Sequence, residues 1–348
     1  METHIKIILA TDDGFAMHTA CLLVSILKNA EAHQAFTFYV LDGGLKPESK
    51  AKLESLKSVH DFEIHYLLID STLMEKLAGL REQTDARWGI YTFLRLLIPE
   101  LLPDEDRLLY LDVDMIVRGS LEELWNMDLE GKSIAASLDS SELYPELSLR
   151  DWRKAILGLS KSQMFNAGML LMDLKKIREE NAFQTTIHWL EHFADIVLFV
   201  DQDGLNVIFR DDKKILSPIW NMSSEPQFAK YFTEPPVIIH YCMKKKPSLY
   251  QYEGLYKEEY WKYLRMTPWK DFRSPDRTWK NILRKRLGIT WLIQRITEWA
   301  IQHNPWMQET LKDYDLQRED ALRLRQKIRE MKAKNTPWER YFEETGNS

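Results

Sequence analysis

The chain has 348 residues, a length that suggests about two domains. Its composition, 45% hydrophobic and 29% charged, is that of a globular protein and excludes a disordered or collagen-like chain. Only two cysteines occur, Cys21 and Cys242, which excludes a disulfide scaffold and a structural zinc site made of cysteines. Residues 1–10 lack a signal-peptide pattern, and no apolar run approaches the ~18 residues that span a bilayer. We therefore expect a protein that stays in a reducing compartment.

The net charge of −6 is unevenly distributed along the chain. Residues 244–295 carry 14 Lys/Arg against 5 Asp/Glu, whereas residues 1–243 are strongly acidic. Seven of the 12 tryptophans lie after residue 260. A basic segment beside an acidic body indicates an anionic partner, such as nucleic acid, an anionic lipid or a phosphorylated substrate.

Strands and helices alternate along the first part of the chain. A β-branched apolar run at 5–10 predicts a strand, and apolar residues at helical spacing predict a helix at 18–29. A strand at 36–41, a polar helix at 47–57 and a strand at 63–68 follow. Further strands are expected at 108–111, 115–117, 133–138, 169–172 and 236–240, with a helix near 183–193. This alternation predicts a parallel sheet covered by helices.

Polar residues follow several of these strands. They are Asp12, Asp112, Asp114, Asp139 and His240. Because open α/β sheets bind ligands beyond the carboxyl ends of their strands, we expect these residues to border a binding site.

Asp112 and Asp114 stand two residues apart, so an extended backbone would point both carboxylates the same way. Converging carboxylates suit a hard divalent cation such as Mg²⁺ or Mn²⁺. The spacing alone is weak evidence, since three other Asp-X-Asp pairs occur in this chain. These two interrupt the apolar run at 108–117, where unpaired carboxylates would be costly to bury. A strand-terminal pair that only caps a turn or faces water is the alternative.

His240 ends a predicted strand and is followed by the basic triplet Lys244–Lys246. A lone histidine is more often a packed or surface residue than a ligand, and a basic triplet is usually a solvated surface. Beside two carboxylates, however, an imidazole favours a transition metal such as Mn²⁺, and a lysine can face phosphate. Neither a dinucleotide glycine fingerprint nor a phosphate-binding loop is present, which favours a nucleotide sugar over ATP hydrolysis.

Five blocks in this order and spacing resemble glycosyltransferase family 8. They are Asp12-Asp13, Tyr110 to Asp114, Phe165 to Gly168, Asp201 to Asp203, and His240 to Cys242 followed by Lys246-Pro247. The likeness covers about residues 4–265 and, within the family, indicates the bacterial lipopolysaccharide galactosyl- and glucosyltransferases. It implies an α/β type A glycosyltransferase fold with a Rossmann-like nucleotide-sugar-binding sheet. It also implies Mn²⁺- or Mg²⁺-dependent, anomer-retaining transfer from a UDP-sugar.

The resemblance assigns roles to individual residues. Asp112, Asp114 and His240 would hold the metal, and Gln202 and Asp139 would be catalytic. The donor would contact Ala10, Thr11, Asp12, Arg95, Asp112, Val113, Asn166, Asp201 and Lys246. Among these, Ala10 to Asp12 would meet the uracil and ribose, and Lys246 the diphosphate.

Plainer roles exist for several of these residues. Asn166 could only form a turn, Asp201 and Gln202 could only begin a helix, and Arg95 could form an ordinary surface ion pair. Two positions also depart from the family pattern. Gly14 stands where relatives often have Asn, and Met243 where a glycine usually approaches the diphosphate.

The chain divides into a catalytic domain at 1–265 and a helical, basic, Trp-rich region at 266–348. Predicted helices at 279–287 and 289–300 combine basic, aliphatic and aromatic residues, which is typical of a membrane-surface element. Packing against the catalytic domain is the alternative. A charged helix at 311–334 would be solvated or packed on a partner. No DNA-reading motif accompanies the basic segment, so we expect no nucleic-acid partner.

The sequence thus predicts a retaining transferase that moves galactose or glucose from a UDP-sugar to a saccharide or glycolipid acceptor. Surface glycan or lipopolysaccharide synthesis is the expected context, in the cytoplasm or peripherally on the inner face of the membrane. One alternative is a sugar transferase with a polyol or protein acceptor. Another is a catalytically silent nucleotide-sugar-binding or membrane-scaffold protein.

Overall fold

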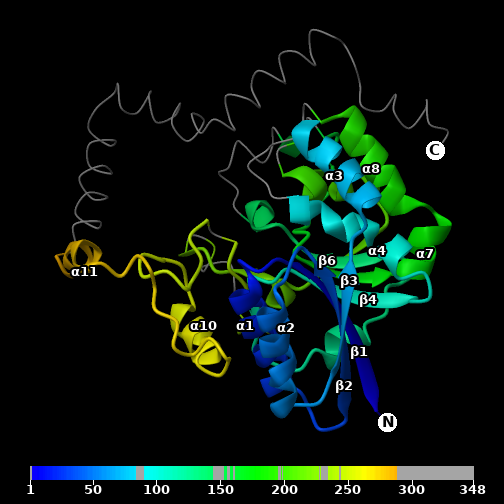
Figure 1. The fold of residues 1–348 in the computed structure, drawn as a ribbon. Helices are drawn as coiled ribbons and strands as arrows, with labels where there is room; N and C mark the ends of the chain where they lie inside the picture. The colour runs from blue at the N-terminus through cyan, green and yellow to red at the C-terminus, as the bar shows by residue number, and fades with distance from the viewer. Residues whose placement is uncertain are drawn as a thin grey trace, which may run out of the picture.

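The computed structural model describes residues 2–83, 90–143, 153–154, 157–159, 161–194, 197, 199–226, 228, 234–242 and 244–287. A seven-stranded sheet forms its centre, with the strand order β3-β2-β1-β4-β7-β6-β8 (Figure 1). These strands are β1 (Thr3–Thr11), β2 (Gln34–Asp42), β3 (Glu63–Leu68), β4 (Arg107–Leu111), β6 (Ile134–Ser137), β7 (Met169–Asp173) and β8 (Lys213–Leu216).

The predicted parallel arrangement is confirmed for most of the strands, but the sheet as a whole is mixed. Strands β1 to β4 are parallel and β8 is parallel to β6, but β7 is antiparallel to both β4 and β6. The reversal arises because β7 begins beside the end of β4, where Leu111 pairs with Met169. The segment just before β7 therefore lies beside Asp112, and the Asp112 backbone N–H donates to the Gly168 carbonyl at 2.8 Å.

Helices cover both faces of the sheet. One face carries α1 (Ala16–Lys28), α2 (Pro47–Glu54) and the 3-10 turn η1 (Ser55–Ser58). The other carries α3 (Ser71–Gln83), η2 (Ile90–Leu97), α4 (Ile98–Leu101), α7 (Leu174–Glu179), α8 (Ala182–His192) and α9 (Val200–Ile208). Short elements complete the domain: α5 (Glu122–Trp125), η3 (Ser140–Leu143) and η4 (Pro218–Trp220).

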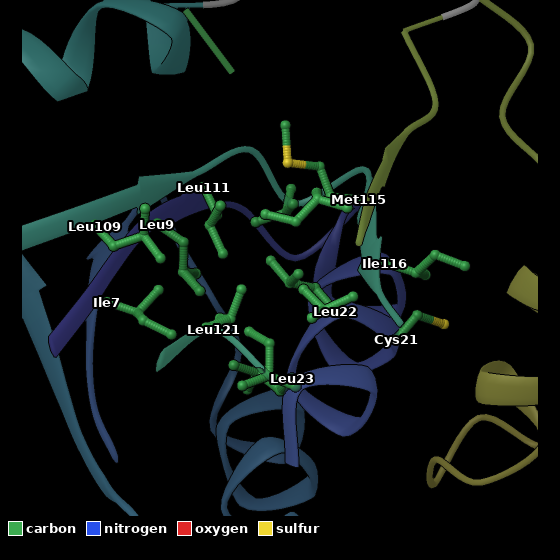
Figure 2. Packing of buried hydrophobic residues seen from close by; sticks show 14 of the residues in the cluster. Ile7, Leu9, Cys21, Leu22, Leu23, Leu109, Leu111, Met115, Ile116 and Leu121 are labelled. Carbon is green, nitrogen blue, oxygen red and sulfur yellow. The ribbon is translucent and has the colours of Figure 1, made fainter. Parts of the chain in front are cut away.

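Alternation along β1 builds the core on both faces. Ile7 and Leu9 belong to the cluster under α1, whereas Ile8 belongs to the cluster under α8. Figure 2 shows Leu22 and Leu23 of α1 directed toward the strand residues. Each buried aliphatic side chain contributes about 1.5–3 kcal/mol, so this packing fixes the strand ends that carry the polar residues.

A second, three-stranded sheet has the order β5-β10-β9. It contains β5 (Met115–Val117), β9 (Met222–Ser223) and β10 (Ile238–His240). Strand β10 is antiparallel to β5 and parallel to β9. His240 pairs with Met115 across the sheet, which places the histidine beside Asp114.

The chain after residue 250 stays attached to the body as far as residue 276. In α10 (Lys257–Leu264), the Tyr260 hydroxyl lies 2.8 Å from His18 Nδ1 of α1. Asp276 accepts hydrogen bonds from the backbone N–H groups of Tyr250 and Gln251. The helix α11 (Trp279–Arg286) follows and buries none of its residues; Figure 1 shows it away from the sheet. The domain division at residue 265 stays a prediction.

The predicted helices at 289–300 and 311–334 lie outside the described residues. Among the helices that are described, none is both long and apolar enough to cross a membrane.

Candidate active site

Two carboxylates and a histidine meet where β4, β5 and β10 come together. Asp112 follows β4, Val113 and Asp114 form the turn before β5, and His240 ends β10. One potential ligand atom from each of Asp112, Asp114 and His240 lies within 4.8 Å of the others. The predicted convergence is therefore observed. A turn produces it rather than an extended backbone, and the Tyr241 N–H fixes that turn by donating to the Asp114 carbonyl at 2.9 Å.

Each carboxylate has one oxygen held by a neighbour and the other directed toward His240. Asp112 Oδ1 accepts from the Tyr110 hydroxyl at 2.7 Å and from Arg95 Nη2 at 3.0 Å, while Oδ2 lies 3.7 Å from His240 Nε2. Asp114 Oδ2 pairs with Lys246 Nζ at 2.6 Å, while Oδ1 lies 3.2 Å from His240 Nε2. Two carboxylate oxygens and one imidazole nitrogen therefore face one another.

This donor set fits a divalent cation such as Mn²⁺ or Mg²⁺. Carboxylate oxygens suit both ions, and the imidazole favours the transition metal. Gly168 makes the close approach possible, because a Cβ there would lie 2.5 Å from His240 Cε1 and 2.8 Å from Asp112 Oδ2. An alanine at this position would collide with two of the three proposed ligands.

Neighbouring opposite charges stabilise the charged forms of Asp114, Lys246 and His240 although all three are largely buried. Burial opposes the charge on Asp114, but Lys246 and His240 outweigh it and lower the pKa of the carboxyl group. Burial also opposes the charge on Lys246, which Asp114 outweighs, so its pKa lies above the ordinary value. The pKa of His240 is raised in the same way, against burial, by Cys242 and Asp114. The cluster is therefore a set of paired charges.

Arg95 is buried, so the idea of an ordinary surface ion pair is wrong for it. Its guanidinium bridges Asp112 and Asp201, with Nε 2.9 Å from Asp201 Oδ2, and donates to the Ala167 carbonyl. It also lies 4.4 Å from the centre of the Tyr110 ring, a cation–π contact. Burial raises the pKa of Asp201 to about 7, although Arg95 acts in the opposite direction.

We call Asp112, Asp114 and His240 the metal-type group. Beside it, hydrogen-bonded side-chain amides lead to Gln202 and Asp139, the two residues predicted to be catalytic. Asn166 Nδ2 donates to Gln202 Oε1 at 3.2 Å, and Gln202 Nε2 donates to Asp139 Oδ2 at 2.9 Å. Gln202 lies in the first turn of α9 and Asn166 forms a turn to Gly168, so the plainer structural roles are present as well. Those roles hold the two amides in contact.

The residues at the end of β1 that are predicted to bind the sugar donor form hydrogen bonds with neighbouring residues. The Thr11 hydroxyl lies 2.7 Å from the Thr19 hydroxyl in α1. The backbone carbonyl of Thr11 accepts from the Gly43 N–H at 2.8 Å. Asp12 Oδ1 accepts from the Phe15 N–H at 2.9 Å. Val113 is buried among apolar side chains. Ala10 and Thr11 still lie near Asp112, because β1 and β4 are neighbours in the sheet.

Sequence reasoning missed three residues beside the site: Tyr91, Tyr110, whose hydroxyl donates to Asp112, and Asn221, whose side-chain oxygen lies 3.0 Å from His240 Nδ1. Tyr110 stands inside a family-like block, whereas no pattern identifies Asn221. The Tyr91 ring covers Gly43, where a Cβ would approach it to 2.5 Å. Met243, one of the two departures from the family pattern, lies outside the described residues.

The fold and the site define an α/β type A glycosyltransferase. The chain is similar to a solved structure of the galactosyltransferase LgtC in complex with donor and acceptor sugar analogs, with a TM-score of 0.65 and 26% identity. The match covers 76% of this chain and 96% of that one. The sequence matches the profile "Glycosyl transferase family 8" over residues 6–250, and the chain belongs to this family.

Curated relatives agree with this assignment. General stress protein A of Bacillus subtilis is 28% identical over 288 residues, which is 77% of this chain and 96% of the relative. The lipopolysaccharide 1,3-galactosyltransferase of Salmonella typhimurium is 25% identical over 249 residues, which is 68% of this chain and 70% of the relative. The predicted family is therefore confirmed.

Proposed function

We propose that this protein is a metal-dependent, retaining hexosyltransferase that transfers galactose or glucose from a UDP-sugar to a saccharide acceptor. The observation that carries the proposal is the convergence of Asp112, Asp114 and His240 in a family 8 fold, within 4.8 Å of one another. Relatives named as lipopolysaccharide galactosyl- and glucosyltransferases support a glycan or glycolipid acceptor.

The donor diphosphate would lie against the metal-type group. A divalent cation bound there would compensate the charge that grows on the diphosphate as it leaves. Lys246 adjoins Asp114, so its ammonium group is within reach of the same phosphates and would stabilise the leaving UDP. Arg95 would hold Asp112 in place through its hydrogen bond to Oδ1.

The surroundings of Gln202 favour transfer without a covalent enzyme intermediate. Its Oε1 accepts two hydrogen bonds, from Asn166 Nδ2 at 3.2 Å and from the Ala167 N–H at 3.1 Å. An amide oxygen is a poor nucleophile, and two donors make it poorer. We therefore favour a short-lived oxocarbenium-like sugar. The C1–phosphate bond breaks with its electron pair on UDP, the acceptor oxygen bonds C1 on the same face, and its proton passes to the leaving diphosphate.

A donor-hydrolysis assay tests this proposal. UDP-glucose and UDP-galactose are incubated separately with the full chain, with and without Mn²⁺, and released UDP is measured. We expect release from at least one donor, with a dependence on the ion. A binder without hydrolysis or transfer would support the alternative, a catalytically silent nucleotide-sugar-binding or scaffold protein. Retention is then checked by NMR of the anomeric proton of the product.

A membrane surface is the proposed partner of α11. The helix carries four basic residues, Lys280, Arg284, Lys285 and Arg286. Four exposed apolar residues lie in the helix or directly after it: Trp279 (70% exposed), Ile282, Leu283 and Leu287 (60% exposed). Each basic side chain near an anionic surface contributes about 1 kcal/mol, and the apolar side chains add to this when they are buried in the interface. Such a contact would hold the enzyme at a membrane surface, for which we propose the inner face, where a lipid-linked acceptor would be accessible.

Vesicle sedimentation tests the membrane contact. The full chain should bind phosphatidylglycerol vesicles at low salt, and binding should weaken as salt screens the charges. A chain ending at Thr278 should lose this binding and keep donor hydrolysis. Full-length protein that ignores these vesicles at low salt would disprove the membrane contact and leave the transferase proposal intact.

A further inference from the structure

Asn221 lies directly behind His240, on the side away from the two aspartates. It stands between η4 and β9 and is 5% exposed. Ser223 pairs with His240, so Asn221, two residues earlier, lies on the same face of the small sheet. Its side-chain oxygen is 3.0 Å from His240 Nδ1.

The orientation of this amide follows from a backbone group. The Gly168 N–H can only donate, and it contacts a side-chain atom of Asn166 at 3.0 Å, so that atom is the oxygen Oδ1. Asn221 contacts the same oxygen at 2.9 Å and must do so with its own nitrogen, Nδ2. Its oxygen therefore faces His240, whose Nδ1 must carry the proton.

We propose that Asn221 is a positioning residue that holds the His240 ring with a proton on Nδ1, so that Nε2 faces Asp112 and Asp114 and offers its lone pair to a cation that displaces the Nε2 proton. The inference rests on the proposed metal-dependent function. A histidine ligand needs its second nitrogen fixed, because a freely turning ring loses part of its affinity for the ion. Loss of such a partner costs about 10–100-fold in metal affinity.

The same chain of amides reaches the proposed catalytic glutamine. Oδ1 of Asn166 takes the hydrogen bond from Asn221, and its Nδ2 gives one to Gln202 Oε1. The Ala167 N–H, a second backbone donor, fixes that end by donating to the same oxygen of Gln202. The backbone N–H groups of Ala167 and Gly168 thus fix which side-chain atoms donate and which accept along this series of amides. Asn221 connects the series to His240.

Titration with Mn²⁺ alone tests the role of Asn221. Free Mn²⁺ is followed by electron paramagnetic resonance in the wild type, in Asn221→Ala and in Ser224→Ala. Ser224 is a matched control, because it is buried nearby and its hydroxyl accepts from Tyr252 instead. We expect a 10–100-fold loss in Asn221→Ala and a change within twofold in Ser224→Ala. An affinity within twofold of wild type in a folded Asn221→Ala protein would overturn the inference.

A measurement on the unmodified chain does not depend on how the variant folds. Histidine-selective ¹⁵N NMR of the wild type with Zn²⁺ reports which ring nitrogen carries the proton, and His240→Gln identifies the signal. A proton on Nδ1 is expected, and one on Nε2 would overturn the inference. Failure of the wild type to bind either ion would overturn the metal-dependent function itself and, with it, this role of Asn221. Undiminished Mn²⁺ binding in Asn221→Ala would overturn only the role of Asn221 and leave the metal-dependent function intact.

Discussion

Two groups of side chains at opposite ends of the central sheet contain two carboxylates and one histidine each. In the part of the chain that the structure describes, these are the two groups able to hold a metal ion. We call the metal-type group, Asp112, Asp114 and His240, the inner triad, and we call Glu31, His33 and Glu122 the outer triad. The inner triad follows β4, where strand carboxyl ends gather. The outer triad lies near Thr3 and Gln34, at the amino ends of β1 and β2.

The two triads differ in what surrounds them. In the outer triad Glu122 is already shared, since it accepts from Thr3, Gln34 and His33, with the His33 contact at 2.9 Å. The side chains of Glu31 and His33 are 59% and 43% exposed, so water competes for them. In the inner triad a neighbour holds one oxygen of each carboxylate and leaves the other facing the imidazole. Residue type is therefore a poor guide to a metal site, and the fixed second partners are a better one.

The largest effect is expected from breaking the inner triad. Asp112→Asn or Asp114→Asn should lower Mn²⁺ affinity by about 100-fold or more, because a neutral amide oxygen replaces a charged ligand. Calorimetric titration of Mn²⁺ and UDP, with circular dichroism to confirm folding, checks this. Unchanged affinity in both variants would remove the metal assignment.

Gln202→Ala is expected to slow transfer by about 10–100-fold with little change in UDP affinity. The Gln202 side chain contacts Asn166 and Asp139, which the family resemblance places near the sugar. An interaction felt mainly in the transition state lowers turnover without a matching loss of binding. Steady-state rates and UDP calorimetry give the two quantities. Normal turnover would leave Gln202 with a helix-start role alone.

Gly168→Ala tests the packing of the inner triad. The added Cβ must displace His240 or Asp112, which should cost about 1–3 kcal/mol of stability and weaken the metal site. Urea unfolding and Mn²⁺ titration measure the two consequences. Gly79→Ala is the control, because a Cβ there meets nothing within 4 Å. Equal behaviour of the two variants would contradict the close contact.

Asp201 should make stability depend on pH. Its pKa is about 7 in the folded chain, above its ordinary 3.8, so between about pH 4 and pH 7 the folded state binds more protons than the unfolded state. Its contribution to the free energy of unfolding therefore falls as pH rises through this window, and is constant above it. Comparing wild type with Asp201→Asn by urea unfolding at several pH values isolates this effect. A constant difference from pH 4 to pH 7 would contradict the raised pKa.

The smallest effect is expected in the outer triad. Glu122→Gln should leave Mn²⁺ affinity and donor hydrolysis within twofold of wild type, because Glu122 is already hydrogen-bonded to Thr3, Gln34 and His33 and the other two side chains of the outer triad are exposed. The same titration that tests the inner triad measures this. A clear loss of Mn²⁺ binding would show that the comparison between the triads is wrong.

The sequence predicted the strands well, because burial gives them short apolar runs. Strand β3 lies at the predicted 63–68, and β4, β5 and β7 differ by at most a residue at either end. Strand direction was not predictable for β7, since an apolar run is the same in either direction. Patterns also could not find Asn221, whose role depends on contacts with residues 55 and 19 positions away. The burial of Arg95 likewise depends on the tertiary fold.

The contact between α1 and α10 has a consequence for how the chain is made. His18 and Tyr260 are 242 residues apart, and Asn29 and Tyr263 are 234 apart. At about 5–20 residues per second, ribosomes need roughly 10–50 s to reach α10 after finishing α1. During that interval one side of α1 has no cover, so nascent chains that end before Lys257 should be cut by proteases near α1. Chains that include α10 should resist this cleavage.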